Sequence, residues 1–239
     1  MAANKKSSAK ASETVQKALV KLDVDMVGVA RISDLARSRL GKSALKLLPS
    51  AQSIVVVAME IYPEFLELTS PERTMGSTNL NDLYRRHTDI LAGRLTGAVY
   101  NVARESRKAG LKAMPLPAEG PCVDGRFLEA VISYKHAAEA AGLGKIGMSS
   151  LLLTHQYGPR VRLALCLTEA TLKSTANDEP GACRYCNICI AKCPAHALSR
   201  PRKGEPYAFN RFACRTYCDA AGGCSECVRV CPVASPRYA

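Results

Sequence analysis

The densest group of reactive side chains is a run of cysteines near the C-terminus. The stretch CRYCNICIAKCP places Cys183, Cys186, Cys189 and Cys193 in a C-x2-C-x2-C-x3-C-P pattern, which is typical of proteins with two [4Fe–4S] clusters. Three thiolates two residues apart can surround one cubic cluster, while the fourth points away before the proline. Zinc is the alternative, but tetrahedral zinc sites normally use two separated cysteine pairs. The spacing therefore favours iron–sulfur chemistry.

A second, variant cysteine pattern follows in CSECVRVCP, which holds Cys224, Cys227 and Cys231. One more ligand must come from upstream, where both Cys214 and Cys218 are available. In two-cluster proteins the cysteine before the proline binds the other cluster. We therefore expect two [4Fe–4S] clusters, one held by Cys183, Cys186, Cys189 and Cys231, the other by Cys193, Cys224, Cys227 and either Cys214 or Cys218.

The rest of the composition limits where this chemistry takes place. The 239 residues include eleven cysteines, of which only Cys122 and Cys166 precede residue 180, and we expect these two to be buried thiols. The N-terminal stretch lacks the apolar core of a secretory signal, and no apolar run reaches the length of a membrane span. We therefore expect a cytoplasmic protein without a membrane partner. The net charge of +12 allows an RNA or acidic-protein partner, but a basic soluble surface is the favoured interpretation.

The glycines of GLGKIGMSS, residues Gly142–Ser150, match G-x-G-x-x-G, the dinucleotide-binding fingerprint. That fingerprint must follow a strand and open a helix, whereas here an alanine-rich helix is expected before it and a strand after it. We therefore expect no nicotinamide or flavin nucleotide at this segment. Two interpretations stay open: Gly142 ends a helix before a tight turn, or the glycines let the backbone approach a large flat ligand.

Hydrophobic periodicity predicts a mixed α+β chain. We expect helices at 12–22, 80–110 and 127–142, strands at 26–32, 53–61 and 111–116, and a strand pair at 149–154 and 160–168. A stretch rich in turn-forming residues, 174–182, is expected to be a linker. This divides the chain into two domains, 1–175 and 176–239.

Beyond the cysteines, one stretch resembles a known group of proteins. AAGLGKIGMSSLLLTHQYGPRVRLALCLTEATL, residues 140–172, is similar to the corrinoid-dependent reductive dehalogenases and to epoxyqueuosine reductase, which show A-G-L-G-x-x-G, then L-L-I-T, then Y-G-P-R-V-R-L before a ferredoxin module. LPSAQSIVVVAMEIY, residues 48–62, also resembles an early strand segment of epoxyqueuosine reductase. The resemblance covers roughly residues 48–232.

The resemblance implies a fold and a set of cofactors. The fold would be a nitroreductase-like α+β domain that holds cobalamin, followed by a ferredoxin-like domain with two [4Fe–4S] clusters. The glycine segment would lie beside the corrin ring, with Gly142, Leu143, Gly144 and Gly147 as the cofactor-binding residues. The family has a lone cysteine where FNRFACRTYC places Cys214, so Cys214 is preferred to Cys218 as the eighth ligand.

The resemblance also suggests a proton donor. Epoxyqueuosine reductases have a Val-Asp pair with a catalytic Asp before the glycine segment, and CVDGRFLEA keeps Asp124 but has Gly125 and Arg126 where the family usually has a small residue and a proline. An acid at a helix start is otherwise a cap. Tyr134 and Tyr157 are further candidates, whereas the four histidines fit no ligand spacing.

Together these features predict an iron–sulfur oxidoreductase whose clusters pass electrons to cobalamin, which then reduces an organic substrate. Its electron donor would be a ferredoxin or flavodoxin, and a small organic substrate is favoured over tRNA. The sequence stops at CPVASPRYA and carries no counterpart of the C-terminal domain that epoxyqueuosine reductase uses with tRNA, so the substrate is not implied. The alternatives are a ferredoxin-like electron carrier for a partner enzyme and a corrinoid-binding or reactivating protein.

Overall fold

The structure, a computed structural model, describes residues 2–70, 79–118, 123–177, 179–205 and 207–233. By internal contacts the chain forms two compact units, each assembled from three separate stretches. The first unit comprises Met1–Met59, Ala92–Leu143 and Arg162–Asp178, and the second comprises Glu60–Leu91, Gly144–Val161 and Glu179–Ala239. Residue 178 lies close to the expected boundary at 175, but two consecutive domains, 1–175 and 176–239, stay a prediction.

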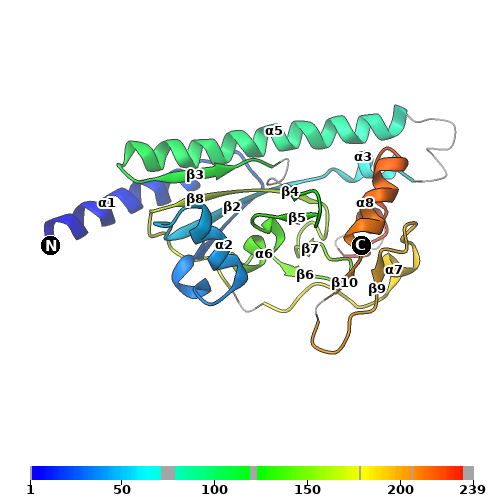
Figure 1. Cartoon of the computed structure of the whole chain (residues 1–239). Helices are drawn as coiled ribbons and strands as arrows, with labels where there is room; N and C mark the ends of the chain where they lie inside the picture. The colour runs from blue at the N-terminus through cyan, green and yellow to red at the C-terminus, as the bar shows by residue number, and fades with distance from the viewer. Residues whose placement is uncertain (1, 71–78, 119–122, 178, 206, 234–239) are drawn as a thin grey trace. The chain divides into compact units, whose positions relative to one another are not determined.

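A four-stranded sheet with the order β1-β2-β8-β3 forms the centre of the first unit (Figure 1). Its strands are β1 (Met26–Arg31), β2 (Ser53–Glu60), β8 (Val161–Thr168) and β3 (Ala113–Leu116). The expected strands at 26–32, 53–61 and 111–116 are thus confirmed. Strand β2 is buried on both faces because its run of valine and isoleucine lies between two neighbouring strands and two helical layers.

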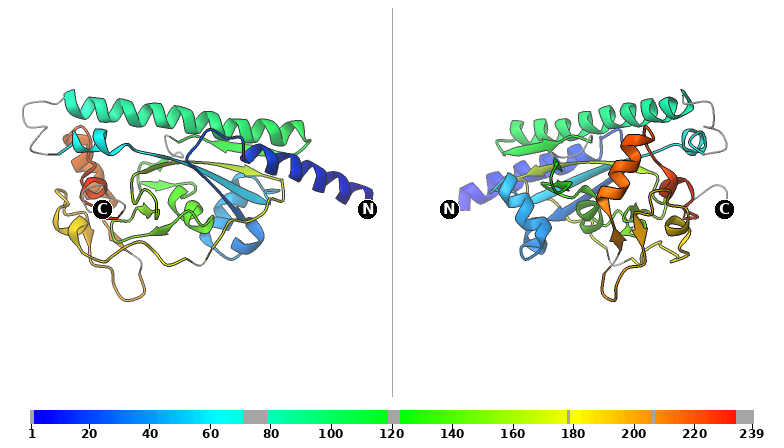
Figure 2. Two further views of the ribbon diagram at one scale, coloured as in Figure 1. Left: turned by 180° about the vertical axis from the view of Figure 1, so that it is seen from behind. Right: turned by 45° about the vertical axis from the view of Figure 1, so that its right-hand side comes forward.

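Helices cover both faces of this sheet (Figures 1 and 2). The expected long helix is confirmed as α5 (Asn79–Lys108), and in the first unit its buried residues include Leu95, Val99 and Val102. Ser106 of α5 and Thr168 of β8 share a hydrogen bond of 3.0 Å between their hydroxyls. The unit also contains α1 (Ala2–Leu19), η1 (Ile32–Leu35), α2 (Arg39–Leu47) and α6 (Tyr134–Ala140).

Helix α6 packs on β1 because β1 carries a glycine at the contact. A Cβ atom on Gly28 would lie 2.8 Å from Leu143 Cγ and 2.9 Å from Ala141 Cβ, which is closer than packed side chains approach. The end of α6 is also fixed by Thr175, whose hydroxyl accepts a hydrogen bond from Val29 N at 2.7 Å and donates one to Ala141 O at 2.6 Å. The lack of a side chain at Gly28 lets α6 approach the sheet, and the Thr175 hydroxyl holds it there.

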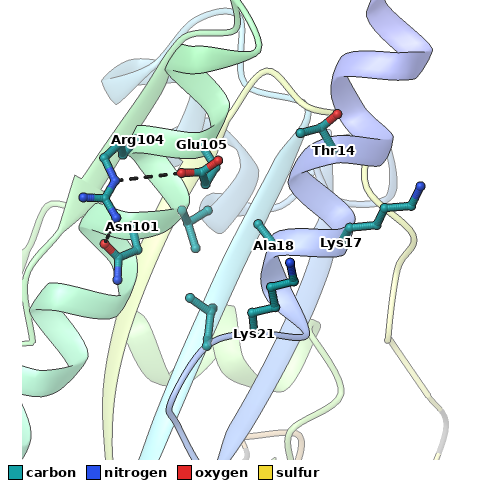
Figure 3. A pocket seen from close by; sticks show the side chains of 9 residues that line it. Thr14, Lys17, Ala18, Lys21, Asn101, Arg104 and Glu105 are labelled. Atoms are coloured by element: carbon teal, nitrogen blue, oxygen red, sulfur yellow. Dashed lines mark hydrogen bonds and ion pairs between the residues drawn. The ribbon is translucent and has the colours of Figure 1, made fainter.

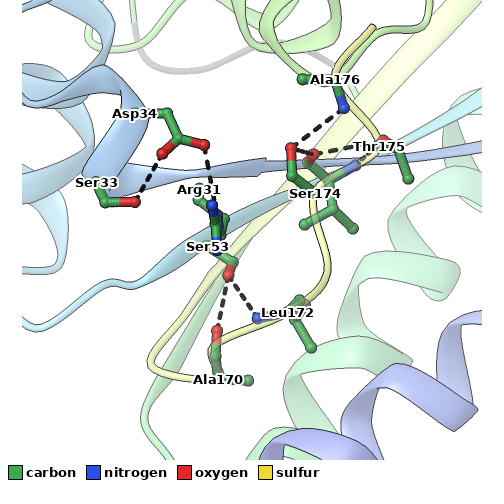
Figure 4. Close-up of polar contacts among 10 residues, drawn as sticks. Arg31, Ser33, Asp34, Ser53, Ala170, Leu172, Ser174, Thr175 and Ala176 are labelled. Carbon is green, nitrogen blue, oxygen red and sulfur yellow. Dashed lines mark hydrogen bonds and ion pairs between the residues drawn. The ribbon is translucent and has the colours of Figure 1, made fainter.

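Hydrogen bonds tie the chain after β8 to the sheet up to the first residues of the expected linker, 174–182. Ser53 Oγ donates to Ala170 O at 2.8 Å and accepts from Leu172 N at 3.1 Å, which holds this stretch beside β2 (Figure 4). Further along, Thr175 N donates to Val29 O at 3.0 Å. These hydrogen bonds tie residues 170–175 to the sheet, so flexibility cannot be inferred from turn-forming composition alone.

Two further expectations about local structure are wrong. The expected helix 127–142 is limited to α6, and β4 (Val123–Asp124) and β5 (Glu129–Ala130) form a hairpin before it. The expected strand pair 149–154 with 160–168 is absent from the described residues, because β7 (Leu152–Leu153) pairs with β6 (Lys145–Ile146) while β8 joins the central sheet. Short apolar segments leave the pairing partner open, and tertiary packing selects it.

The second unit carries the cysteine-rich segment. Its elements are α3 (Pro63–Glu67), β6, β7, α7 (Ile188–Ala191), β9 (Leu198–Ser199), β10 (Ala208–Phe209), α8 (Arg211–Ala220) and α9 (Glu226–Arg229), together with the first turns of α5. Strands β9 and β10 pair antiparallel. The elements are short, so most of the backbone around the cysteines is turn and loop.

Gly142, at the C-terminal end of α6, adopts a backbone conformation that favours glycine. Gly142 has a φ of +74°, and Gly142 N and Leu143 N donate to Glu139 O and Ala138 O, both at 3.0 Å, as in a Schellman motif. A Cβ atom here would lie 2.5 Å from Thr175 O. We expect Gly142→Ala to lower the free energy of unfolding by roughly 2–4 kcal/mol, measured by urea denaturation.

The matched control is Gly97→Ala on α5. Nothing lies within 4 Å of a Cβ atom at Gly97, and alanine stabilises an exposed helix position by up to about 1 kcal/mol over glycine. Equal stability changes in the two variants would contradict a special backbone role for Gly142.

Candidate cluster sites

Four cysteines from two distant stretches line one hollow in the second unit. Cys183, Cys186 and Cys189 contribute one side, and Cys231 contributes the other, next to apolar Leu153 and further residues of the same hollow. These four are the set expected to bind the first cluster. Burial, together with the charges of the three neighbouring thiols, raises the pKa of the Cys231 thiol to about 11.

The tight spacing of the first three cysteines is accommodated by backbone in the left-handed region. Tyr185 has a φ of +52° and Asn187 a φ of +61°, and α7 begins immediately after Asn187. Residues of this conformation bend the chain sharply between successive cysteines. The loop therefore directs three thiols from seven consecutive residues, 183–189, toward one hollow.

A second group of thiols gathers around α8 and α9, which we call the second cysteine set. It consists of Cys193, Cys214, Cys218, Cys224 and Cys227. Burial is the main cause, and the charges of Cys224, Cys214 and Cys193 are further causes, of a rise in the pKa of the Cys227 thiol to about 12. The half-buried Cys227 thiol thus lies near the three cysteines expected to share its cluster.

A helix cap and a glycine turn position the cysteines on α8 and just after it. Asn210 caps α8 by accepting a hydrogen bond from Ala213 N at 3.1 Å, and α8 then presents Cys214 and Cys218 one turn apart. After α8 the chain reverses at Gly222 and Gly223, which have φ of +69° and +125°, and returns to Cys224. The Cys193 sulfur accepts a hydrogen bond from Ala197 N at 3.3 Å.

The choice between Cys214 and Cys218 can be examined from their neighbours. Burial raises the pKa of Cys214, and the Cys218 thiol, which hydrogen-bonds to it, lowers that pKa in part. Cys214 also feels the charges of Cys224 and Cys193, and it is among the neighbours of Cys227. Cys224 in turn has Cys218 and Cys193 among its neighbours, so Cys214 as the eighth ligand stays a prediction from the resemblance.

The donor chemistry fits iron–sulfur clusters. Each set supplies at least four thiols, and cysteine thiolates are the ligands that [4Fe–4S] clusters use. Among the described residues, no three His, Cys, Asp or Glu side chains are grouped closely enough to hold a single metal ion as they stand. Cys166 lies fully buried in β8 with a pKa raised by burial to about 12, as expected for a buried thiol, and Cys122 lies outside the described residues.

The YGPR turn, residues 157–160, packs against the segment that follows Cys231. Gly158 has a φ of +56°, and a Cβ atom there would clash with the carbonyl oxygen of Val233, two residues after Cys231. Arg160 is buried and pairs with Glu60 at 2.7 Å. The close approach of Gly158 to Val233 places this turn against the segment that carries Cys231, whereas the Arg160–Glu60 pair ties the turn to the end of β2.

The glycine segment has no nucleotide-binding context. Gly142 ends α6, and β6 follows at Lys145, so the order is helix, loop, strand as expected. The side chain of Leu143 is buried and packs against Gly28. A Cβ atom on Gly144 would meet the backbone of Leu153. These positions pack against protein atoms along their Cβ directions, so only their backbone is available to a ligand.

Gly147 differs, because it adjoins the first cysteine hollow. A Cβ atom there would meet the Leu153 side chain and would lie 3.4 Å from Cys183 Sγ. Glycine at this position leaves room beside a thiol that is expected to bind a cluster.

Asp124 lies in the β4–β5 hairpin rather than at a helix start. Its carboxylate accepts hydrogen bonds from Arg126 N at 2.9 Å and from Arg126 Nη2 at 2.9 Å. The Arg126 guanidinium, followed by the Arg126 backbone N–H, holds the pKa of Asp124 below its usual value. The carboxyl is therefore ionised at neutral pH in this arrangement, whereas a proton donor needs a raised pKa.

The remaining candidates have structural partners. Tyr134 OH donates to Pro117 O at 2.8 Å. His87 is buried, stacks on Phe65 with ring centroids 4.2 Å apart, and its Nε2 accepts from Tyr62 N at 3.2 Å. Burial lowers the pKa of His87, consistent with a neutral packing residue.

A larger pocket of about 450 Å³ lies between α1 and α5 in the first unit (Figure 3). Lys17, Lys21 and Arg104 line it, and Arg104 Nη2 donates to Asn101 Oδ1 at 2.9 Å. Glu105 also lines the pocket and is paired with Lys108 at 2.9 Å. Its lining contains no cysteine, so pocket size does not identify the chemically distinctive site.

Comparison with known proteins identifies relatives of the chain. No family model matches it. A tetrachloroethene reductive dehalogenase of Desulfitobacterium hafniense is 29% identical over 203 residues, covering 75% of this chain and 32% of the relative. Epoxyqueuosine reductase of Synechocystis is 26% identical over 174 residues, covering 72% and 53%. The chain is similar to two groups of reductases.

Solved structures give the same result for the fold. The catabolic reductive dehalogenase NpRdhA, in its K488Q variant, matches with a TM-score of 0.68 at 18% identity, over 92% of this chain and 31% of that one. An epoxyqueuosine reductase solved with a tRNA stem loop matches with a TM-score of 0.56 at 20% identity, over 95% and 66%. The mixed α/β fold is thus shared with both groups, and the inferred resemblance to them is confirmed.

The similarity covers only part of the length of these reductases. The chain spans about a third of the dehalogenases that it matches. Among its described helices, none is long and apolar enough to cross a membrane.

Proposed function

We propose that this chain is an iron–sulfur oxidoreductase that holds two [4Fe–4S] clusters and a cobalamin. The observation that carries the proposal is the meeting of Cys231 with Cys183, Cys186 and Cys189 in one hollow, although 231 belongs to a separate cysteine motif. Such an exchange between motifs is the arrangement that two-cluster proteins use. The reductase relatives support the same class of reaction.

The residues would divide the work as follows. Cys183, Cys186, Cys189 and Cys231 would hold one cluster, and Cys193, Cys214, Cys224 and Cys227 the other. When bound, the clusters would supply one-electron transfer and the cobalamin a reducing cobalt centre. Cys227 and Cys231 are partly covered by protein, and the close approach of Gly158 to Val233 would help keep the Cys231 segment in position.

The cobalamin would lie against the glycine segment. Gly142, Leu143, Gly144 and Gly147 would contact it through their backbone, because the Leu143 side chain is packed inside the protein and the Cβ directions of Gly142 and Gly144 are filled by protein atoms. This part of the proposal rests on the resemblance, and one solved relative is described as supporting a mechanism for B12-dependent dehalogenation.

Asp124 would donate the proton only after losing its partner. With Arg126 bound to it, the carboxyl stays ionised and has no proton to give. Both side chains are exposed, so Arg126 could move away. Asp124 would then also need a bound substrate or cofactor to cover it and raise its pKa before it could take up a proton from solvent and donate it. Asp124 therefore stays the proposed proton donor, on the condition that Arg126 moves away from it.

The names of the relatives suggest two substrate classes. One group is named for tetrachloroethene and the other for epoxyqueuosine, which occurs in tRNA in one solved relative. A small organic substrate is the favoured class, with a ferredoxin or flavodoxin as the donor.

The test is turnover by the anaerobically reconstituted chain with a low-potential reductant. We expect chloride release from tetrachloroethene or a related organohalide, and a loss of at least about a hundredfold in Asp124→Asn with unchanged iron content. Corrinoid binding without reduction of either substrate class would favour a corrinoid carrier. Bound clusters with no corrinoid would favour an electron carrier.

A further inference from the structure

The pocket between α1 and α5 is a cavity that the proposed function does not use. It lies wholly in the first unit, and its volume of about 450 Å³ falls in the size range of small-molecule sites. One wall comes from the C-terminal part of α1 and the residues just after it, and the other from the last turns of α5 (Figure 3). The walls therefore bring together two segments that are about eighty residues apart in the chain.

Positive charge is in excess at this pocket. Three cations, Lys17, Lys21 and Arg104, line it against one carboxylate, Glu105. The outer partners of these groups, a carboxylate that pairs with Lys17 at 2.7 Å and a lysine that pairs with Glu105 at 2.9 Å, add equal and opposite charges. A concave surface with an excess of one sign of charge concentrates ions of the other sign, so an anion is the expected ligand.

Two of the cations have donors to offer to such an anion. In the part of the chain that the structure describes, Lys21 forms no ion pair of its own. Arg104 Nη2 donates to Asn101 Oδ1 at 2.9 Å, whereas Arg104 Nε lies 3.9 Å from Glu105 Oε1, which is beyond hydrogen-bond range. A guanidinium carries five N–H donors, so the bond to Asn101 leaves further donors for a ligand.

The pocket also has an apolar part. Ala18, Leu22 and Val102 contribute to its lining, and Val102 is fully buried. An inorganic anion would leave this apolar surface in water, whereas the organic body of a larger ligand would cover it. A nucleic-acid backbone presents phosphates and sugars and has no comparable apolar group to place in such a recess. The combination favours a compact molecule with one anionic end and one apolar end.

We propose that this pocket binds a small organic phosphate, whose phosphate group pairs with Lys21 and Arg104 and whose organic body covers Ala18, Leu22 and Val102. Lysine and arginine are the side chains with which proteins bind phosphate groups. The lining contains no member of either cysteine set, so the site goes beyond the proposed function and does not depend on bound clusters.

The test is isothermal titration calorimetry of the full chain with phenyl phosphate as the probe. We expect saturable binding with a dissociation constant of about 1 mM or tighter, and weaker binding of inorganic phosphate and of phenol, each of which offers only one of the two ends. Lys21→Ala should weaken binding of phenyl phosphate by about tenfold or more, because a charge-assisted hydrogen bond is lost. Glu105→Gln should tighten it, because the variant removes the one carboxylate of the lining.

Lys42→Ala is the matched control. Lys42 is an exposed lysine on α2 of the same unit and lies outside the pocket, so its removal lowers the net charge equally without removing a donor. The tighter binding expected of Glu105→Gln is a gain, which a folding defect cannot produce.

Three results would overturn the proposal. One is the absence of saturable binding of phenyl phosphate to the wild type, and another is an equal loss of affinity in Lys42→Ala and Lys21→Ala. The third is binding of a single-stranded RNA that Lys21→Ala weakens while phenyl phosphate does not bind, which would make this groove a nucleic-acid surface. Iron analysis of the same samples keeps these outcomes apart from a failure of the proposed function, which concerns the clusters alone.

Discussion

Anaerobic reconstitution of the wild-type chain should load about eight irons and eight sulfides, and replacing Cys231 by alanine should leave about four. The physical reason is that each cluster needs four thiolates, and the first hollow loses one of its four when Cys231 is removed. Iron and acid-labile sulfide analysis measures the result. Stoichiometric zinc in place of iron, or full iron content in Cys231→Ala, would contradict the ligand assignment.

Double variants test the exchange of ligands between the two motifs. Cys183→Ala combined with Cys231→Ala removes two ligands from one hollow, so about four irons should remain. Cys189→Ala combined with Cys193→Ala should remove nearly all iron, although the two residues are close in sequence, because Cys193 belongs to the second set. Cluster assignment by sequence proximity alone would predict the reverse pattern of losses.

Cob(II)alamin added to the reconstituted chain should bind in the base-off form. The expectation comes from the similarity to the two reductase groups. The glycine segment also lies between a helix and a strand, which is not the order of a dinucleotide-binding site. Electron paramagnetic resonance distinguishes the two forms, because an axial nitrogen ligand splits the cobalt signal. We expect complete conversion at stoichiometric protein, and a base-on spectrum identical to that of the free cofactor would contradict cobalamin binding.

A variant series makes this result specific to the glycine segment. Gly144→Val should abolish cobalamin binding, because its side chain would press on the Leu153 backbone and displace the loop. Gly93→Val on α5 is the matched control, since nothing lies within 4 Å of a Cβ atom there. Iron content should be measured in both variants, because a loop displacement that also empties the first hollow would show a general folding defect.

Local sequence determined several features of this protein by itself. The strands β1, β2 and β3 and the helix α5 follow from runs and periods that are visible within each segment, since burial of one face requires a fixed spacing of apolar residues. The end of α6 at Gly142 likewise follows from the need for a residue that tolerates positive φ. The grouping of Cys183, Cys186 and Cys189 follows from their spacing.

Tertiary structure alone decided the features that depend on distant partners. Leu152 and Leu153 could have paired with β8, but β8 is taken by β2 and β3 in the central sheet. The hairpin around Asp124 replaced an expected helix, and with it came Arg126, which sets the charge of that carboxyl.

The cysteines show the same division. Spacing predicted which cysteines could bind clusters but left both Cys214 and Cys218 open, and only the resemblance to the reductases favoured Cys214. Their different neighbours arise only when α8 packs beside Cys193, Cys224 and Cys227. Spacing along the chain records local geometry, whereas proximity between segments is created by the packing of the whole unit.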